Sequence, residues 1–351
     1  MHPIRQGDEA RLGCENGIRP PGASAAGPLR DGTSGQAAHA TRCARVLVLV
    51  LTHNGGRYLG PLAASLACST YRDFDLWIID NASTCASTRQ ILSDFADRRV
   101  AKVLRHPENL RFAAGYNRVL RPLVEEHAYD FVFILNDDVE VGADCLRLLV
   151  EYLDAVPGAF CVAPTMTDLG HPHRVVTVGG RMSRLNGRGR SILGGRHVDR
   201  VRGLAPFPSR CVAAFAMLVR VQHLQTLGVF DERYHHYFED TDLCFRARRA
   251  GLTVAVVPGA VVAHQIGGSE QWLQDGEKFY YYVRNRWFFL ERYGWPLVWR
   301  LGFFLTPRLL WSIARDARLR AAYRDALRDA LRGRGGARRP EERPPSLERR
   351  P

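Results

Sequence analysis

The sequence predicts an α/β fold with a doubly wound, mostly parallel sheet. Short, uninterrupted runs of aliphatic and β-branched residues recur along the first half of the chain, as in strands buried on both faces. A helix-length segment separates each run from the next, and strand–helix–strand repeats form right-handed crossovers in a parallel sheet. A chain of 351 residues is long enough to bury a substantial core around such a sheet.

The first half supplies four expected strands. They are the apolar runs at residues 44–51, 76–80, 102–106 and 131–136. Helices are expected between them, notably over residues 56–68 and 114–127. Residues 1–42 are rich in Gly, Ala, Pro and Arg and lack an apolar period, which is typical of a disordered extension.

The second half has a different pattern. Further strands are expected at residues 159–166, 211–220 and 253–264. Between the first two lies a long basic, glycine-rich segment, residues 174–202. The globular domain is expected to span residues 43–270. An aromatic and arginine-rich helical extension follows over residues 271–332, and residues 333–351 are expected to form a disordered basic tail.

The net charge of +13 comes almost entirely from arginine, and residues 315–351 contain twelve arginines against six acidic residues. Such an excess indicates nucleic acid, an anionic membrane surface or a solvated tail. No zinc-finger spacing, ribonucleoprotein motif or basic region with heptads is present, so nucleic acid is not an expected partner.

An amphipathic pattern favours the membrane surface. Apolar residues repeat every four positions among arginines at Leu319, Tyr323, Leu327 and Leu331. A basic helix of this kind lies in the membrane interface, helped by tryptophans upstream. Those tryptophans are Trp287, Trp295, Trp299 and Trp311. The alternative is that they pack against the globular domain.

The cysteines and the N-terminus indicate the compartment. None of the eight cysteines forms a CxxC pair, and several lie in apolar runs where a small buried thiol is common. We therefore expect reduced thiols and a cytoplasmic protein. The first residues contain no apolar segment before a cleavage site, so no signal peptide is expected.

Polar residues follow the expected strands at one edge of the sheet. Ligands of open parallel sheets bind beyond the carboxyl ends of the strands. The segments that follow the first four strands are Thr52–Gly56, Asp80–Ser83, Pro107–Gly115 and Asn136–Asp138. Because these ends meet at one edge, the sequence predicts a binding site there.

Asp137 and Asp138 follow an apolar run that is expected to be buried, with only Asn136 between. Two like charges are costly to desolvate together unless a cation receives them. A divalent cation that bridges a diphosphate would do so, and hard carboxylate oxygens suit Mg or Mn. The alternative is an ordinary turn, since turns favour Asn and Asp. Asp80 likewise has two interpretations. It accepts a hydrogen bond from a nucleobase or ribose, or it caps the next helix.

A second acidic cluster, Glu239–Asp242, begins an expected helix among several aromatic residues. A carboxylate in that setting would have a raised pKa, which suits a general base. Capping of the helix is the alternative. His264 ends the last apolar strand and is either a core residue or a metal ligand.

Three common motifs are missing from the chain. It has no GxGxxG after the first strand, no GxxxxGK[ST] and no GxSxG. Their absence argues against a dinucleotide oxidoreductase, a P-loop protein and a serine hydrolase.

Six segments together resemble the family 2 inverting nucleotide-sugar glycosyltransferases, which have the GT-A fold. In chain order they are VLVLVLTHNGGRYL, WIIDNAST, ENLRFAAGYNRVL, FILNDDVEV, GVFDERYHHYFEDTDLCFRARRAGL and VVPGAVVAHQIGGS. The likeness runs from about residue 46 to residue 269. It is greatest to the rhamnosyltransferase-like branch that builds bacterial surface polysaccharide, and it implies a smaller, mixed sheet on the acceptor side.

The resemblance implies roles for eleven residues. Thr52 and Asn54 would line the nucleotide pocket, Asp80 would bind the base, and Asn109 and Asn117 would lie near the nucleotide-sugar. Asn136, Asp137 and Asp138 stand where the family has its DxD motif, with Asp138 as the metal-binding carboxylate. Asp240 would be the base, Glu239 its neighbour at the acceptor pocket, and His264 a further metal contact.

The implied function is transfer of a hexosyl or rhamnosyl group from a nucleoside diphosphate sugar to a saccharide or lipid-linked acceptor, with inversion. Mg or Mn would be the cofactor, and the enzyme would lie at the inner face of the cell membrane. Two alternatives remain: a membrane-surface binding protein with an inactive GT-A fold, and a nucleotidyltransferase. The two acidic clusters argue against the first, and the short loop HNGGRYL with one arginine argues against the second.

Overall fold

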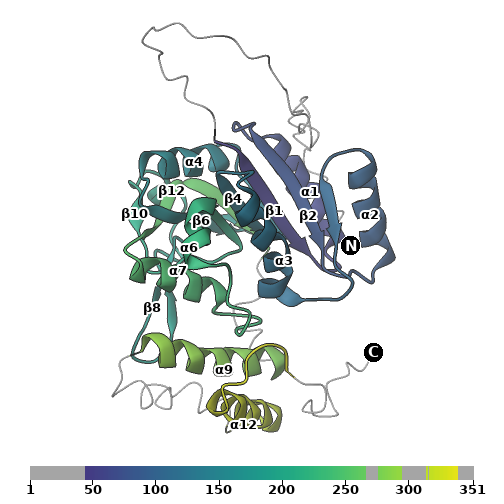
Figure 1. The fold of residues 1–351 in the computed structure, drawn as a ribbon. Helices are drawn as coiled ribbons and strands as arrows, with labels where there is room; N and C mark the ends of the chain where they lie inside the picture. The colour runs from purple at the N-terminus through teal and green to yellow at the C-terminus, as the bar shows by residue number, and fades with distance from the viewer. Residues whose placement is uncertain (1–43, 266–275, 295–313, 315, 339–351) are drawn as a thin grey trace, which may run out of the picture.

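The computed structural model of the protein describes residues 44–265, 276–294, 314 and 316–338. A large sheet with helices packed on it forms the main body, and a pair of C-terminal helices lies along one side (Figure 1). The extension expected at residues 1–42 lies outside the described residues, as does most of the expected basic tail.

The first half of the chain forms the parallel part of the sheet. Its strands are β1 (Val46–Thr52), β2 (Phe74–Asp80), β3 (Lys102–Arg105) and β4 (Phe131–Asn136). The helices between them are α1 (Gly56–Ala67), α2 (Ala86–Asp97) and α3 (Arg111–Glu126). The strand order β4-β1-β2-β3 confirms the doubly wound prediction. Register aligns Thr52 with Asp80 and Leu51 with Asn136, so the polar ends of three strands are level.

The second half extends the same sheet beyond β4 and makes it mixed. The added strands are β5 (Val139–Val141), β6 (Ala159–Asp168), β7 (His171–Thr177), β10 (Phe207–Pro208), β11 (Ala216–Arg220) and β12 (Thr253–His264). A separate two-stranded sheet consists of β8 (Gly180–Met182) and β9 (Gly189–Ser191). The helices here are α4 (Cys145–Ala155), α5 (Asp199–Arg202), α6 (Val221–Leu227) and α7 (Glu239–Arg249). Because β11 runs antiparallel to β4, it starts beside the end of β4.

The C-terminal helices α9 (Gly276–Tyr293) and α12 (Ala317–Leu331) pack against each other and against the domain (Figure 1). Trp287 is 6% exposed, and most of the aromatic face of α9 is buried. Leu319 is buried as well, whereas Leu331 is 69% exposed. In the described part of this segment, the aromatic residues therefore pack against the protein, as the alternative interpretation expected. The other three tryptophans, Trp295, Trp299 and Trp311, lie outside the described residues.

Residues 333–338, expected to begin the disordered tail, return to α9. The backbone amide of Arg338 donates to the Tyr281 hydroxyl at 2.9 Å, and the buried Arg338 guanidinium pairs with Asp325 at 2.6 Å. In the part of the chain that the structure describes, no helix is both long and apolar enough to cross a membrane.

Helix α9 also holds a strained turn that precedes α7. His235, Tyr237 and Phe238 all have positive φ, a conformation that costs a non-glycine residue about 1–3 kcal/mol. The side-chain amide of Asn285 donates to the backbone carbonyls of Tyr234, His236 and Tyr237, at 2.6–2.9 Å. Arg284, which is 1% exposed, donates to the carbonyls of Arg233 and Tyr234. These bonds offset the strain and set the direction in which α7 starts.

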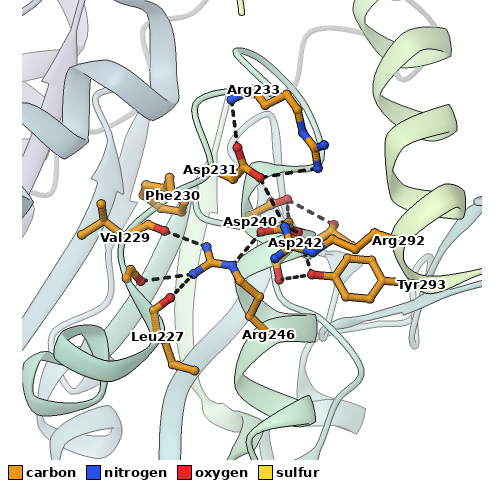
Figure 2. A network of polar contacts seen from close by, with 12 residues as sticks. Leu227, Val229, Phe230, Asp231, Arg233, Asp240, Asp242, Arg246, Arg292 and Tyr293 are labelled. Carbon is orange, nitrogen blue, oxygen red and sulfur yellow. Dashed lines mark hydrogen bonds and ion pairs between the residues drawn. The ribbon is translucent and has the colours of Figure 1, made fainter. Parts of the chain in front are cut away.

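A buried carboxylate joins α7 to α9 (Figure 2). Asp242 is fully buried and accepts from Arg246 at 2.8 Å, from Arg292 at 3.0 Å and from the Tyr293 hydroxyl at 2.7 Å. Arg246 continues the network to the carbonyls of Leu227, Gly228 and Val229. Asp242 thus anchors the first turn of α7 from two directions.

We expect Asp242→Asn to lower the free energy of unfolding by about 3–5 kcal/mol, the usual cost of removing one partner from a buried ion pair. The asparagine keeps the shape of the side chain, but it leaves the charges of Arg246 and Arg292 without their buried partner. Urea unfolding monitored by circular dichroism measures the change.

Asp231→Asn is the matched control, because Asp231 also pairs with Arg292, at 3.3 Å, but its side chain is 27% exposed. Exposed pairs contribute less than about 1 kcal/mol. Equal losses in the two variants would show that the buried network does not anchor α7.

Candidate active site

Thr52 and Asp137 meet at the carboxyl edge of the parallel strands. The Thr52 hydroxyl donates to Oδ2 of Asp137 at 2.6 Å, and Thr52 is 1% exposed. Burial and the neighbouring Asp138 raise the pKa of Asp137 to about 6, although the bond from Thr52 opposes this. A Cβ atom on Gly55 would lie 1.8 Å from Oδ2 of Asp137, so this position must be glycine for the carboxylate to sit there.

Asp138 and His264 come together from distant parts of the chain. Antiparallel pairing sets His264 opposite Val139, and the amide of Gln265 donates to the carbonyl of Asp138. Oδ1 of Asp138 lies 3.0 Å from Nε2 of His264, with the side chains 24% and 18% exposed. The distance is that of an ion pair, but the two buried atoms are not aligned for a hydrogen bond.

This pair fits a divalent cation that shares its coordination with a substrate. Two lone-pair-bearing atoms lie side by side, buried and without hydrogen-bond partners, which is costly unless a further group satisfies both. Mg is commonly held by one or two protein ligands together with substrate phosphates and water. Among the residues described, no three His, Cys, Asp or Glu side chains gather closely enough to hold a metal ion by themselves.

The residues assigned to the nucleotide pocket organise the loops around this edge. Asp80 is buried and accepts from the Ser83 amide at 2.8 Å. Oδ1 of Asn54 accepts from the amides of Thr84 and Cys85, both at 2.8 Å, and so holds the start of α2 close to β1. Both candidates lie at the edge of the sheet that the sequence predicts.

Asn109 lies at the same edge, and a neighbour that the sequence reading overlooked holds it there. The Asn81 side chain donates to Oδ1 of Asn109 at 3.0 Å and accepts from the Leu110 amide at 2.9 Å. Asn81 is 2% exposed and directly follows Asp80. Asn81 could have been identified from the sequence, because Asp80 and Asn81 form a polar pair at the end of a strand. Only Asp80 was assigned a role.

Asn117 lies within α3 rather than in a loop at the end of a strand. It is fully buried in α3, accepts from the amide of Phe230 and donates to the carbonyl of Phe230 and to Glu232. These bonds occupy both ends of its amide. Its place in the structure is therefore a link between α3 and the segment that leads to α7.

Glu239 and Asp240 form the second acidic site. Burial raises the pKa of both carboxyls, and the neighbouring charge of Asp240 helps to raise that of Glu239 to about 8. Oε2 of Glu239 is buried without a partner. Asp240 accepts from the Ala214 amide at 3.2 Å and lines a pocket of about 220 Å³ between the residues that precede β11 and the β8–β9 sheet. Asp240 is therefore the carboxylate that faces open space.

A short stretch before β11 connects the two acidic sites. The Asn136 amide donates to the carbonyl of Phe215 at 2.9 Å, and the Phe215 ring lies 5.5 Å from the His264 ring. The next residue back, Ala214, donates to Asp240, and Phe215 itself lines the Asp240 pocket. The Asp138–His264 pair and the half-buried Asp240 therefore both lie next to Phe215.

The sequence reading also overlooked Arg284 and Asn285, which control the position of Asp240 from α9. Their signal was a polar pair inside an aromatic run, YYVRNRW, where a buried polar residue must find partners. Trp287 in this run was expected either to assist a membrane-interface helix or to pack against the domain, and neither expectation identifies the partners of Arg284 and Asn285.

Comparison with known proteins agrees with this arrangement. The chain is 28% identical over 235 residues to the N-acetylglucosaminyl-diphospho-decaprenol L-rhamnosyltransferase of Mycobacterium tuberculosis, covering 62% of this chain and 75% of that protein. It is 28% identical over 222 residues to an uncharacterized protein, y4gI, of Sinorhizobium fredii, but spans only 23% of that protein.

Solved structures show the same fold at low identity. GalNAc-T7, crystallised with UDP, GalNAc and Mn2+, superimposes with a TM-score of 0.58 at 15% identity, over 83% of this chain and 56% of that one. Residues 1–349 of TarS from S. aureus, in complex with UDP, give a TM-score of 0.52 at 17% identity, over 82% and 80%. The chain thus spans little more than half of the GalNAc-T7 chain.

Two family models match. One, for glycosyl transferase family 2, matches residues 47–199, and the other, for glycosyl transferase family group 2, matches residues 131–322. The second match alone covers more than half of the chain, and both contain the Asn136–Asp138 segment. The protein is a glycosyltransferase with the GT-A fold and belongs to glycosyl transferase family 2.

Proposed function

We propose that the protein transfers a hexosyl or rhamnosyl group from a nucleoside diphosphate sugar to a lipid-linked or saccharide acceptor, with inversion at the anomeric carbon. One observation carries the proposal. A carboxylate–imidazole pair without a hydrogen-bond partner and a half-buried carboxylate that faces a pocket both lie next to Phe215. Inverting transfer needs these two functions on opposite sides of the reacting carbon.

The donor would bind at the edge formed by β1, β2 and β4. Asp80 and Asn54 would contact the nucleoside, with Thr52, Asn109, Asn136 and Asp137 around them. Asp138 and His264 would hold Mg or Mn, which when bound neutralises the charge of the leaving diphosphate. GalNAc-T7, which shares the fold, was crystallised with UDP and Mn2+ and supports this choice.

The acceptor would enter the pocket beside Asp240. Its carboxylate would take the proton from the acceptor hydroxyl as the oxygen attacks the anomeric carbon, and the bond to the diphosphate would break on the opposite face. Burial raises the pKa of Asp240, which brings that pKa closer to the value expected of an effective general base. Glu239, buried beside it with a pKa of about 8, would be protonated at neutral pH and add no second negative charge.

The acceptor class is suggested by the mycobacterial relative, which is named for a glycosyl diphosphate lipid. We propose a lipid-linked acceptor of this kind, in the synthesis of bacterial surface polysaccharide. Such acceptors lie in the membrane, and exposed arginines on α12 and after it would attract the protein to the anionic inner face.

Donor binding should require a divalent cation. Calorimetry with UDP-, dTDP- and GDP-sugars should identify one nucleotide that binds in Mg or Mn and loses at least tenfold in affinity, about 1.4 kcal/mol, on addition of EDTA. His264→Ala should reproduce the loss in saturating metal. Affinity that is unchanged by EDTA and by the substitution would contradict the metal site.

Asp240→Asn should reduce turnover by roughly 10²–10⁴, the usual contribution of a general base, and should leave donor affinity nearly unchanged. Asparagine keeps the acceptor oxygen for the Ala214 amide but cannot take a proton. Steady-state kinetics and donor calorimetry on the same preparation measure the two effects.

Glu239→Gln is the matched control for this substitution. It makes the same acid-to-amide replacement one residue away, but at a side chain that would already be neutral, so turnover should fall far less. An Asp240→Asn protein that works at full speed, or a larger loss in Glu239→Gln, would place the base elsewhere.

Sedimentation with vesicles tests the membrane proposal. Binding to anionic vesicles should weaken at high salt, because screening shortens the reach of surface charges. Each arginine near an anionic surface contributes about 1 kcal/mol, roughly fivefold in affinity. The triple variant Arg320→Gln, Arg324→Gln and Arg332→Gln should therefore bind roughly 100-fold more weakly.

Three exposed arginines at the other end of the molecule provide the control: Arg89, Arg98 and Arg99, on α2 and just after it. The same change to glutamine there removes the same net charge. Equal losses in both triple variants would show a general charge effect rather than a membrane-facing helix.

A further inference from the structure

Two arginines face each other across the small β8–β9 sheet. Register pairs Arg181 directly with Arg190, and like charges at opposed positions destabilise a two-stranded sheet. Neither makes an ion pair with any carboxylate in the described part of the chain. Both line the pocket that contains Asp240. A free anion is the group that would relieve this repulsion.

A second, larger pocket of about 660 Å³ adjoins the first, and Arg181 lines both. Arg210 and Arg248 line the second pocket. Both are exposed, and neither pairs with a carboxylate among the described residues, although Arg248 lies 5.9 Å from the Phe245 ring centre. Asp240 is the single acidic residue in the walls of the two pockets. The space beside the proposed base is therefore strongly cationic.

The distances suit an extended ligand. Arg248 follows Asp240 by eight residues on the same helix, which places its backbone roughly 12 Å further along the axis. A sugar ring held at Asp240 and carrying a charged group at its other end would bring that group toward Arg181, Arg210 and Arg248. Arginine recognises phosphate oxygens through several charge-assisted hydrogen bonds.

We propose that Arg181, Arg210 and Arg248 form a subsite for the diphosphate of a glycosyl diphosphate acceptor. The subsite deepens the proposed function and depends on it. This subsite is separate from the site of the donor diphosphate, which would lie at the cation held by Asp138 and His264. It selects acceptors in which the sugar is joined to its lipid through phosphates.

The test compares two acceptors that differ only in their phosphates. One is N-acetylglucosaminyl diphosphate with a short prenyl chain, and the other is the same sugar joined directly to that chain. In Arg210→Gln and Arg248→Gln, the KM for the diphosphate acceptor should rise at least tenfold, with kcat and the donor KM nearly unchanged. The phosphate-free acceptor should respond little.

Arg196→Gln is the matched control, because Arg196 is also an exposed arginine but lines neither pocket. It should leave both acceptors unaffected. Equal KM changes for the two acceptors, or an equal effect of Arg196→Gln, would overturn the subsite. Thermal unfolding of each variant checks that these exposed substitutions leave the fold intact.

Calorimetry with the diphosphate acceptor, without donor, tests the subsite independently of turnover. Binding should weaken at least tenfold in Arg210→Gln and Arg248→Gln. If no sugar is transferred but this loss is seen, the proposed function fails and the anion subsite stands. If the two substitutions instead weaken binding to anionic vesicles and leave the soluble acceptor unaffected, the arginines contact lipid headgroups and the subsite is refuted.

Discussion

The buried carboxylate of Asp242 is the interaction on which the geometry of the proposed acceptor side depends. It fixes the first turn of α7 through Arg246 below and through Arg292 and Tyr293 on α9 (Figure 2). Asp240 lies two residues earlier, at the point where a strained turn becomes a helix. Three residues of that turn have positive φ, and Asn285 and Arg284 donate to backbone carbonyls within and just before it. The C-terminal helix therefore belongs to the architecture of the site.

Opposite charges divide the site into two halves. At the proposed donor edge, carboxylates gather in positions where a cation would stabilise them, and the Thr52 hydroxyl donates a hydrogen bond to Asp137. On the proposed acceptor side, arginines gather that have no acidic partner among the described residues, as an anion would require. Phe215 lies next to both halves. In the proposed reaction such a division would give specificity, because each diphosphate would be attracted to a different kind of partner.

Much of the fold could be predicted because the first half of the chain obeys simple rules. Its strands are continuous apolar runs, and residues 131–136 form β4 as expected. Once the strands are parallel, the polar residues after them must meet at one edge, as Thr52, Asp80 and Asp137 do. The contact between Asp138 and His264 was harder to predict from the sequence, because it depends on the antiparallel pairing of β12 with the three-residue strand β5. The resemblance assigns Asn117 to the surroundings of the nucleotide-sugar, but its side chain is fully buried and bonded to Phe230. A motif in the sequence does not reveal such a contact.

The sequence by itself determined the parallel sheet, the polar edge and the two acidic clusters, since these follow from local pattern and from the geometry of crossovers. Only the tertiary structure decided what the described part of the aromatic C-terminal segment, α9, does. Its amphipathic pattern is compatible with a membrane or with a protein surface, because both are apolar partners. The buried polar residues Asn285 and Arg284 distinguish the two, since the carbonyls that satisfy them lie about fifty residues earlier in the chain. The polar pair is visible in the sequence, but partners at that separation are not.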